Sequence, residues 1–266
     1  MNKNDFNNIS VNLIGSGNLA THIGITLNNN GLKINYVWSR NLENAKILAE
    51  KIKTTYTNNF IELYNNKAIY LICVPDSEIK SIAKKINSKN SILIHTSAST
   101  NISVLKKFST NCGVFYPLQT FSKNSKLVNF KNLPVFIEYS NNNVKNILKY
   151  LCDIINAKLL EANSEQRLFI HIAAIFANNF TNHILSISQV IAKQNNIDFT
   201  LLRPIISKTF EKLKTANPKE LQTGPAIRND LDTINKHLKS LSNNPDFAKI
   251  YSFVSESIIK MYKEEK

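Results

Sequence analysis

The feature that most constrains this chain lies near its start. A short apolar run, Val11–Ile14, ends at Gly15-Ser16-Gly17, and a segment with helical spacing of apolar residues follows at once. This arrangement predicts a strand, a tight turn and a helix, with the pattern G-x-G-x-x-A completed by Ala20. Gly15 permits the turn, Gly17 lets a phosphate approach the backbone, and Ala20 lets the helix lie close to the strand. The pattern is typical of a dinucleotide-binding turn, although a glycine turn in another α/β unit can match it too.

The start of the predicted helix supplies the other half of such a site. The first N–H groups of a helix have no partner within the helix, and its positive end attracts an anion. We therefore predict that a pyrophosphate binds at Gly15, Ser16, Gly17, Asn18 and Leu19.

Apolar runs alternate with helical segments through the first half of the chain. The run at 68–74 is continuously apolar, as expected for a strand buried on both faces of a parallel sheet. We predict an α/β domain with a doubly wound, mainly parallel Rossmann sheet. The predicted strands are 9–14, 34–38, 54–57, 68–74, 91–95, 112–116, 133–139 and 157–160. The predicted helices between them are 18–29, 42–52, 76–86 and 144–155.

No strand pattern is found after about residue 164, which predicts an all-helical C-terminal domain. Asn163 or Ser164 can cap a long helix to about residue 195, and Asp198 can cap the next, with a kink at Pro204. Two further helices are predicted in this domain: one begins at Pro225, and the last spans 245–262. At 266 residues and 43% hydrophobic composition the chain can hold two domains, which we place at 1–160 and 161–266.

The composition excludes several classes of function. The net charge is +14, but the lysines are scattered along the chain and form no long basic run. Lys, Asn and Ile share A/T-rich codons, so genome composition explains the excess of lysine at least as well as function does. We therefore expect no nucleic-acid partner. The three cysteines are odd in number and widely spaced, which favours reduced thiols in a cytoplasmic protein. No apolar signal core and no uninterrupted apolar span of about 18 residues is present, so we expect no membrane association.

The end of the second predicted strand indicates which dinucleotide binds. An NAD-type domain places an acidic residue there, to bind the ribose 2′-hydroxyl. Here Ser39 and Arg40 stand instead, and a hydroxyl and a guanidinium suit a 2′-phosphate. We predict NADP as the cofactor. Taken without the glycine turn, Arg40 would be interpreted more simply as a surface arginine at the end of a strand.

Ligands of such sheets lie at the carboxyl ends of the strands. Val74 and Pro75 follow the central strand and are predicted to flank the cofactor, and Ser97 is predicted to lie near the nicotinamide. His95 is an acid–base candidate or, as we favour, a hydrogen-bonded structural residue. Gln119 either reaches a substrate or only ties down its turn.

The long helix carries a polar stripe. His171, Asn178 and Asn182 are spaced by seven and four residues, which places them on one face of an α-helix that we expect to be buried. A ligand or hydrogen bonds between the domains could satisfy them. No acidic ligand lies between His171 and His183, so no metal site is expected.

The chain resembles a bacterial family that joins a Rossmann-like domain to a helical C-terminal domain of unknown function. The resemblance rests on five motifs in order, GSGNLATH (15–22), HTS (95–97), FYPLQTFS (115–122), ANNFTNH (177–183) and TGP (223–225). Members are generally described as NADP- or deazaflavin-dependent oxidoreductases. More distantly the architecture resembles pyrroline-5-carboxylate reductase and 6-phosphogluconate dehydrogenase, which implies a C-terminal domain like that of the latter.

One departure matters for the reaction. β-Hydroxyacid dehydrogenases carry a helix lysine four residues before an asparagine, and here Ala174 and Ile175 stand at that spacing before Asn178 and Asn179. We therefore expect an NADP-dependent oxidoreductase of a small polar carbonyl, imine or alcohol bound between the domains, with His171 as the proton-transfer group. The alternative is an NADP-binding sensor or scaffold without turnover. We also expect a homodimer, formed through the helical domain.

Overall fold

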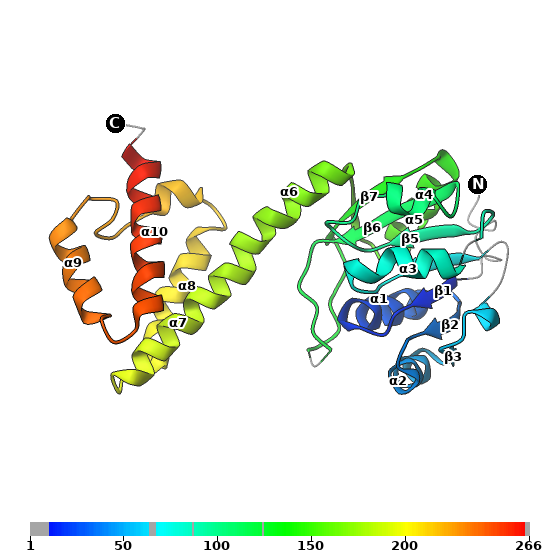
Figure 1. Cartoon of the computed structure of the whole chain (residues 1–266), viewed down its shortest axis with the longest axis horizontal. Helices are drawn as coiled ribbons and strands as arrows, with labels where there is room; N and C mark the ends of the chain where they lie inside the picture. Colours follow the sequence, from blue (N-terminus) through cyan, green and yellow to red (C-terminus); the bar gives the residue numbers. More distant parts are fainter. Residues whose placement is uncertain (1–10, 64–67, 87, 124, 264–266) are drawn as a thin grey trace. The chain divides into compact units, whose positions relative to one another are not determined.

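The computed structural model of this chain describes residues 11–63, 68–86, 88–123 and 125–263 (Figure 1). It divides into two compact units, Met1–Ala177 and Asn178–Lys266. The division falls within the long helix, whereas the sequence places the domain boundary ahead of that helix, at 160/161. Residues 9 and 10 of the first predicted strand lie outside the described residues.

The first unit is built on an eight-stranded sheet with the order β3-β2-β1-β4-β5-β6-β7-β8. All neighbours are parallel except β6 and β7, which are antiparallel. The predicted doubly wound, mainly parallel sheet is therefore confirmed. Its strands are β1 (Val11–Ile14), β2 (Ile34–Trp38), β3 (Thr55–Thr57), β4 (Ile69–Ile72), β5 (Ile92–His95), β6 (Asn111–Pro117), β7 (Pro134–Tyr139) and β8 (Lys158–Glu161).

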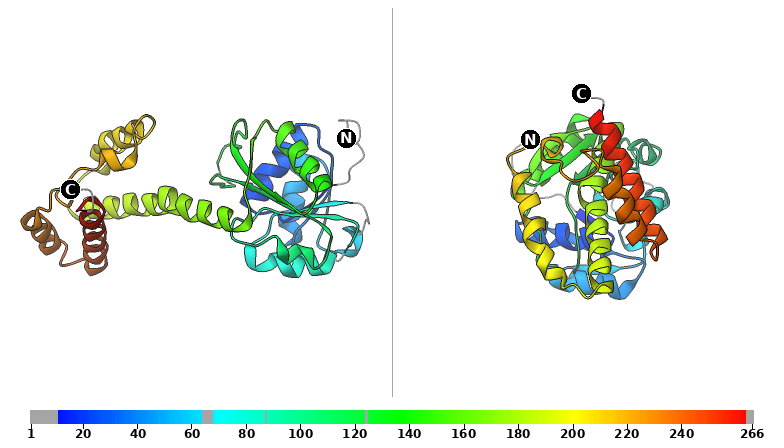
Figure 2. Two further views of the ribbon diagram at one scale, coloured as in Figure 1. Left: turned by 90° about the horizontal axis from the view of Figure 1, so that it is seen from above. Right: turned by 90° about the vertical axis from the view of Figure 1, so that its left-hand side faces the viewer.

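Helices cover both faces of this sheet. Successive strand residues point to opposite faces, so Leu13 belongs to one apolar cluster and Ile14 to the other. The helices α1 (Asn18–Asn29), α2 (Leu42–Ile52) and α5 (Asn142–Ile154) pack on the first face, and α3 (Asp76–Ile86) and α4 (Ser103–Lys106) on the second (Figure 2). The two cores bury the central strands β1, β4 and β5 completely, which explains why they lack alternation.

The long helix runs from Ser164 to Gln194 and is interrupted by a π-helical turn. It comprises α6 (Ser164–Ala174), the π segment η3 (Ile175–Phe180) and α7 (Thr181–Gln194). The expectation of a buried helix is wrong for the single chain, because Phe169, Phe176 and Phe180 are exposed. The helix is long and apolar enough to cross a membrane. This is weak evidence for a membrane span, because the core helix of a water-soluble protein can have the same length and composition.

The second unit is helical, as predicted. It also contains α8 (Arg203–Lys212), α9 (Leu231–Ser240) and α10 (Pro245–Lys263), with short 3-10 segments at Phe199–Leu202 and Pro218–Leu221. Two boundaries differ from the sequence prediction. Pro204 lies in the first turn of α8 instead of kinking it, because a proline at that position loses no helical hydrogen bond. The helix predicted from Pro225 begins only at Leu231, where the Asp230 side chain accepts the N–H of Thr233.

Candidate functional site

The turn after β1 has a backbone that only glycine tolerates. Gly15 has φ +121°, and a Cβ there would lie 2.2 Å from the carbonyl oxygen of Cys73. Its N–H donates to the carbonyl of Trp38 at 2.7 Å, so the turn is tied to β2 as well as to β4. A Cβ on Gly17, by contrast, would meet nothing within 4 Å. The first glycine therefore shapes the turn, and the second leaves open space beside it.

The first turn of α1 is left free for an anion. Its N-cap is Gly17, which has no side chain to accept the exposed N–H groups, and no acidic residue lies in the first turn. The side chain of Asn18 accepts the backbone N–H of Lys123 at 3.3 Å, and Leu19 packs on the apolar core. The open N–H groups and the positive helix end fit a phosphate.

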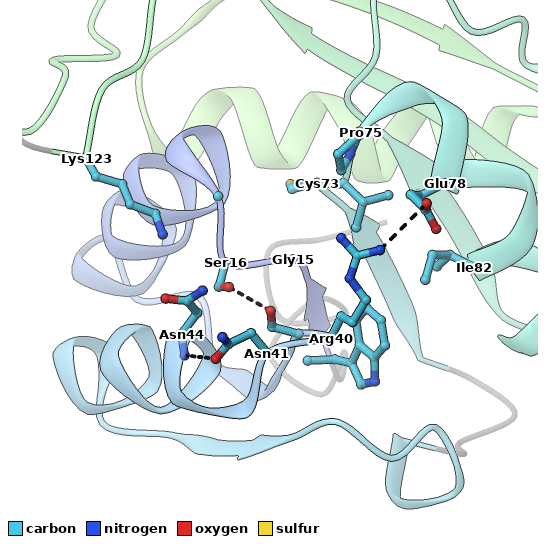
Figure 3. A pocket seen from close by; sticks show the side chains of 14 residues that line it. Gly15, Ser16, Arg40, Asn41, Asn44, Cys73, Pro75, Glu78, Ile82 and Lys123 are labelled. Carbon is cyan, nitrogen blue, oxygen red and sulfur yellow. Dashed lines mark hydrogen bonds and ion pairs between the residues drawn. The ribbon is translucent and has the colours of Figure 1, made fainter.

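A pocket of about 240 Å³ opens in front of this turn (Figure 3). At its floor the Ser16 hydroxyl donates to that of Ser39 at 2.8 Å. The guanidinium of Arg40 lies 3.8 Å from the Glu78 carboxylate, with both side chains well exposed. Such a long surface pair is weak, so the guanidinium can turn toward a bound anion. The lining residues are Gly15, Ser16, Gly17, Trp38, Ser39, Arg40, Asn41, Asn44, Cys73, Val74, Pro75, Glu78, Ile82 and Lys123.

Most of the predicted cofactor ligands meet in this pocket. Seven of them line it: Gly15, Ser16, Gly17, Ser39, Arg40, Val74 and Pro75. Three others do not: Asn18, Leu19 and Ser97. Asn18 and Leu19 can still offer their backbone N–H groups, whereas the Ser97 hydroxyl donates to that of Thr100 at 3.0 Å. Sequence reasoning missed Asn44 and Lys123, which reach the pocket from α2 and from the segment after β6.

His95 ends β5 as a neutral, buried side chain. Its Nδ1 accepts the N–H of Ser97 at 3.2 Å, which places the ring hydrogen on Nε2. Burial, helped by the charge of Arg167, lowers the pKa of His95 to about 3. At neutral pH this residue cannot donate a proton as an imidazolium, which agrees with the structural role favoured for it.

Arg167 of α6 is completely buried and holds the loop after β5. Its Nε donates to the carbonyls of Ser97 and Ala98, and its Nη2 donates to that of Thr100 at 2.6 Å. Its Nη1 pairs with the carboxylate of Glu138 on β7. The guanidinium thus fixes α6 to the carboxyl ends of two strands. The sequence marks Arg167 only as a first-turn residue, since its partners on β7 and in the loop after β5 are 29 to 70 residues away.

Tyr116 and His171 form a pair at the end of β6. The phenolic oxygen lies 3.1 Å from Nδ1 of the imidazole, and the rings meet edge to face. Burial raises the pKa of Tyr116, so the phenol is protonated at neutral pH and can donate to Nδ1 or accept from a hydrogen on it. Where the phenol donates to Nδ1, the ring hydrogen of His171 is on Nε2. Sequence reasoning identified His171 but not Tyr116, whose position in an apolar strand gave no signal.

The remaining predicted substrate residues are not joined to this pair by the structure. Gln119 is exposed, and its Oε1 accepts the N–H of Thr120 at 2.8 Å, so it ties down its own turn. Asn178 and Asn182 are exposed and lie in the second unit. The spacing that placed them on the face of His171 assumes 3.6 residues per turn, and the π segment Ile175–Phe180 breaks that period. Their roles stay predictions.

The comparisons with known proteins agree with this geometry. Residues 10–99 match the family described as NADP oxidoreductase, coenzyme F420-dependent, and residues 133–258 match a domain of unknown function, DUF2520. The crystal structure of a candidate NADP oxidoreductase, BF3122 of Bacteroides fragilis, is 36% identical with a TM-score of 0.87, covering 96% of this chain and 99% of that one. No protein in the search of curated proteins matches significantly.

More distant structures share the fold. Protein TM1727 of Thermotoga maritima is 22% identical with a TM-score of 0.70, over 96% of this chain and 99% of that one. Pyrroline-5-carboxylate reductase of Coxiella burnetii is 16% identical with a TM-score of 0.54, over 96% and 97%.

Fold and pocket together define an oxidoreductase that binds a pyridine nucleotide on a Rossmann-like sheet. The chain belongs to the family of the Bacteroides fragilis protein, and in this chain an NADP oxidoreductase domain is followed by a DUF2520 domain.

Proposed function

We propose that this oxidoreductase uses NADP, with the pyrophosphate at the start of α1 and the 2′-phosphate at Ser39 and Arg40. The observation that carries the proposal is the end of β2, where no acidic residue stands and an exposed guanidinium lines the pocket. A carboxylate there would accept the ribose hydroxyls of NAD and repel a phosphate, whereas a guanidinium binds a phosphate. The printed descriptions of the family and of the Bacteroides fragilis protein support the same cofactor.

Replacing Arg40 with alanine is expected to remove most of the preference for NADPH. The Kd for NADPH should rise about tenfold, because a charge-assisted hydrogen bond is lost, and the Kd for NADH should change by less than about twofold. Isothermal titration of both nucleotides measures this. Lys51→Ala removes a charge from the far end of α2 and serves as the matched control. An unchanged NADPH affinity in Arg40→Ala would rule out this residue as the phosphate ligand.

For the chemistry, we propose reduction of a small polar carbonyl or imine, or the reverse oxidation of an alcohol or amine. Bound NADPH would supply a hydride to the substrate carbon. The proton for the oxygen or nitrogen would come from Nε2 of His171, the phenol of Tyr116 would pass its own proton to Nδ1 in the same step, and water would return a proton to the phenolate. Gln119, Asn178 and Asn182 remain candidate orienting groups.

A screen of carbonyls and imines with NADPH tests the reaction, and two variants test the pair. His171→Asn and Tyr116→Phe are each expected to lower kcat, by about 100-fold and about 10-fold, with the Kd for NADPH unchanged. His183→Asn alters an exposed histidine and should retain full activity. Turnover that persists in His171→Asn would reject the proton-transfer role. Tight NADPH binding with no oxidation by any substrate would favour the sensor or scaffold instead.

We also propose that the protein is a cytoplasmic homodimer formed through its helical part. Apolar side chains are exposed along the long helix and on α8 and α10, for example Phe169, Ile205 and Phe253. Exposed apolar side chains gathered on helices are typical of an interaction surface, and a second copy of the chain can cover them. The cysteines of the described residues are buried free thiols, which suits a reducing compartment.

Light scattering at micromolar concentration is expected to give twice the chain mass of 30.2 kDa. A mass near 30.2 kDa would contradict the dimer. Flotation with phospholipid vesicles provides a second readout, because association with the vesicles would assign the apolar helix to a membrane instead.

A further inference from the structure

The connection between β6 and β7 is much longer than its geometry requires. Antiparallel neighbours can be joined by two to five residues, yet residues 118–133 intervene here. We call its described residues, 118–123 and 125–133, the strap; in Figure 1 they leave the end of β6 toward α1 and return to β7. Long connections of this kind in compact domains are commonly functional.

His22 on α1 binds both arms of the strap. Its Nδ1 accepts the N–H of Val128 at 3.1 Å, so the ring hydrogen is on Nε2, which donates to the carbonyl of Ser122 at 2.8 Å. The imidazole is buried and packs on the ring of Phe121 at 5.5 Å. A single neutral side chain thus ties the strap to the helix whose first turn faces the phosphate pocket.

These ties bring one ammonium group to the pocket. The N–H of Lys123 donates to the side chain of Asn18 at 3.3 Å, directly at the start of α1. Figure 3 shows the Lys123 side chain pointing toward Ser16 and Asn44, across the pocket from Arg40. Within the part of the chain that the structure describes, no carboxylate forms an ion pair with this lysine. An unpaired ammonium beside the open end of a helix suits a phosphate.

We propose that Lys123 binds a phosphate of the dinucleotide and that His22 acts as its positioning residue through the strap. The inference rests on the proposed NADP site and adds a ligand from the connection between β6 and β7. The phosphate is either the 2′-phosphate or the pyrophosphate, since the pocket extends from Gly17 to Arg40.

Lys123→Met removes the charge and keeps the length of the side chain, and Lys126→Met does the same on the strap outside the pocket. We expect Lys123→Met to weaken NADPH binding about tenfold, and Lys126→Met to change it by less than about twofold. Titration with NADH separates the two phosphates. An equal loss for NADH assigns the pyrophosphate, and a loss confined to NADPH assigns the 2′-phosphate. Equal affinities of Lys123→Met and wild type for both nucleotides would overturn the assignment.

The positioning role of His22 is tested with a double-mutant cycle. His22→Ala should weaken NADPH binding although the residue does not line the pocket, and adding Lys123→Met should then cost less than about twofold. His22→Gln, which keeps a donor and an acceptor, should recover part of the affinity of wild type and remains testable if the alanine variant fails to fold. A full tenfold loss on adding Lys123→Met to His22→Ala would reject the coupling, as would a His22→Gln protein that binds NADPH as tightly as wild type and loses nothing when Lys123→Met is added.

The two proposals fail in distinguishable ways. If wild-type protein binds neither NADPH nor NADH, the proposed function fails. If wild type binds NADPH and Lys123→Met binds it equally well, only the role of the strap fails.

Discussion

Gly15→Ala is expected to lower the free energy of unfolding by roughly 3 kcal/mol or more. The new methyl group would lie 2.2 Å from the carbonyl oxygen of Cys73, a residue that follows β4 directly and whose N–H donates to the carbonyl of Ile14 on β1 at 2.7 Å. Alanine at φ +121° adds backbone strain, and strain and overpacking each cost about 1–3 kcal/mol. Chemical denaturation followed by circular dichroism measures the loss.

Gly17→Ala is the matched variant, because the same methyl group would meet nothing within 4 Å. Its stability should stay within about 1 kcal/mol of wild type, the cost of alanine at an N-cap. Its affinity for NADPH should fall at least about tenfold, since the methyl group occupies the space in which a pyrophosphate approaches the backbone. A Gly17→Ala protein that binds NADPH as wild type does would contradict the placement of the pyrophosphate.

The second large effect is expected from Arg167→Met. The substitution leaves the Glu138 carboxylate without its cation and removes the donors of the carbonyls of Ser97, Ala98 and Thr100. Removing one partner of a buried ion pair typically costs about 3–5 kcal/mol, and we expect a loss of that size in urea-induced unfolding.

Glu138→Gln provides the control for this ion pair. The double variant Arg167→Met/Glu138→Gln should lose less stability than the sum of the two single variants, because neither charge is then left unpaired. Strict additivity would show that Arg167 acts through its backbone contacts alone. A loss below about 1 kcal/mol in Arg167→Met would show that the buried guanidinium does not secure α6.

The parts of the fold that follow from local patterns could be predicted. The glycine turn, the continuously apolar strands and the change to helical periodicity after residue 164 are each encoded within a few neighbouring residues. The pocket follows from the same local signals, since Gly15 and Arg40 stand at the ends of two adjacent parallel strands. Strand ends of a parallel sheet meet at one edge, so these residues could be brought together without coordinates.

The features that depend on distant contacts could not be predicted. His22 lies on α1, but its partners are about 100 residues later in the strap. In the sequence Tyr116 has the pattern of an ordinary strand residue, and only the structure shows that it contacts His171. The π segment gives no compositional signal, yet it breaks the helical spacing on which the stripe from His171 to Asn182 was based.

The central claim is that the pocket at the ends of β1 and β2 selects NADP. Titrating NADPH and NADH separately into the wild-type protein at one ionic strength tests it most directly. The site described here predicts that NADPH binds about tenfold or more tightly than NADH, because only NADPH carries the phosphate that Arg40 can bind. Equal affinities for the two nucleotides, or tighter binding of NADH, would contradict it.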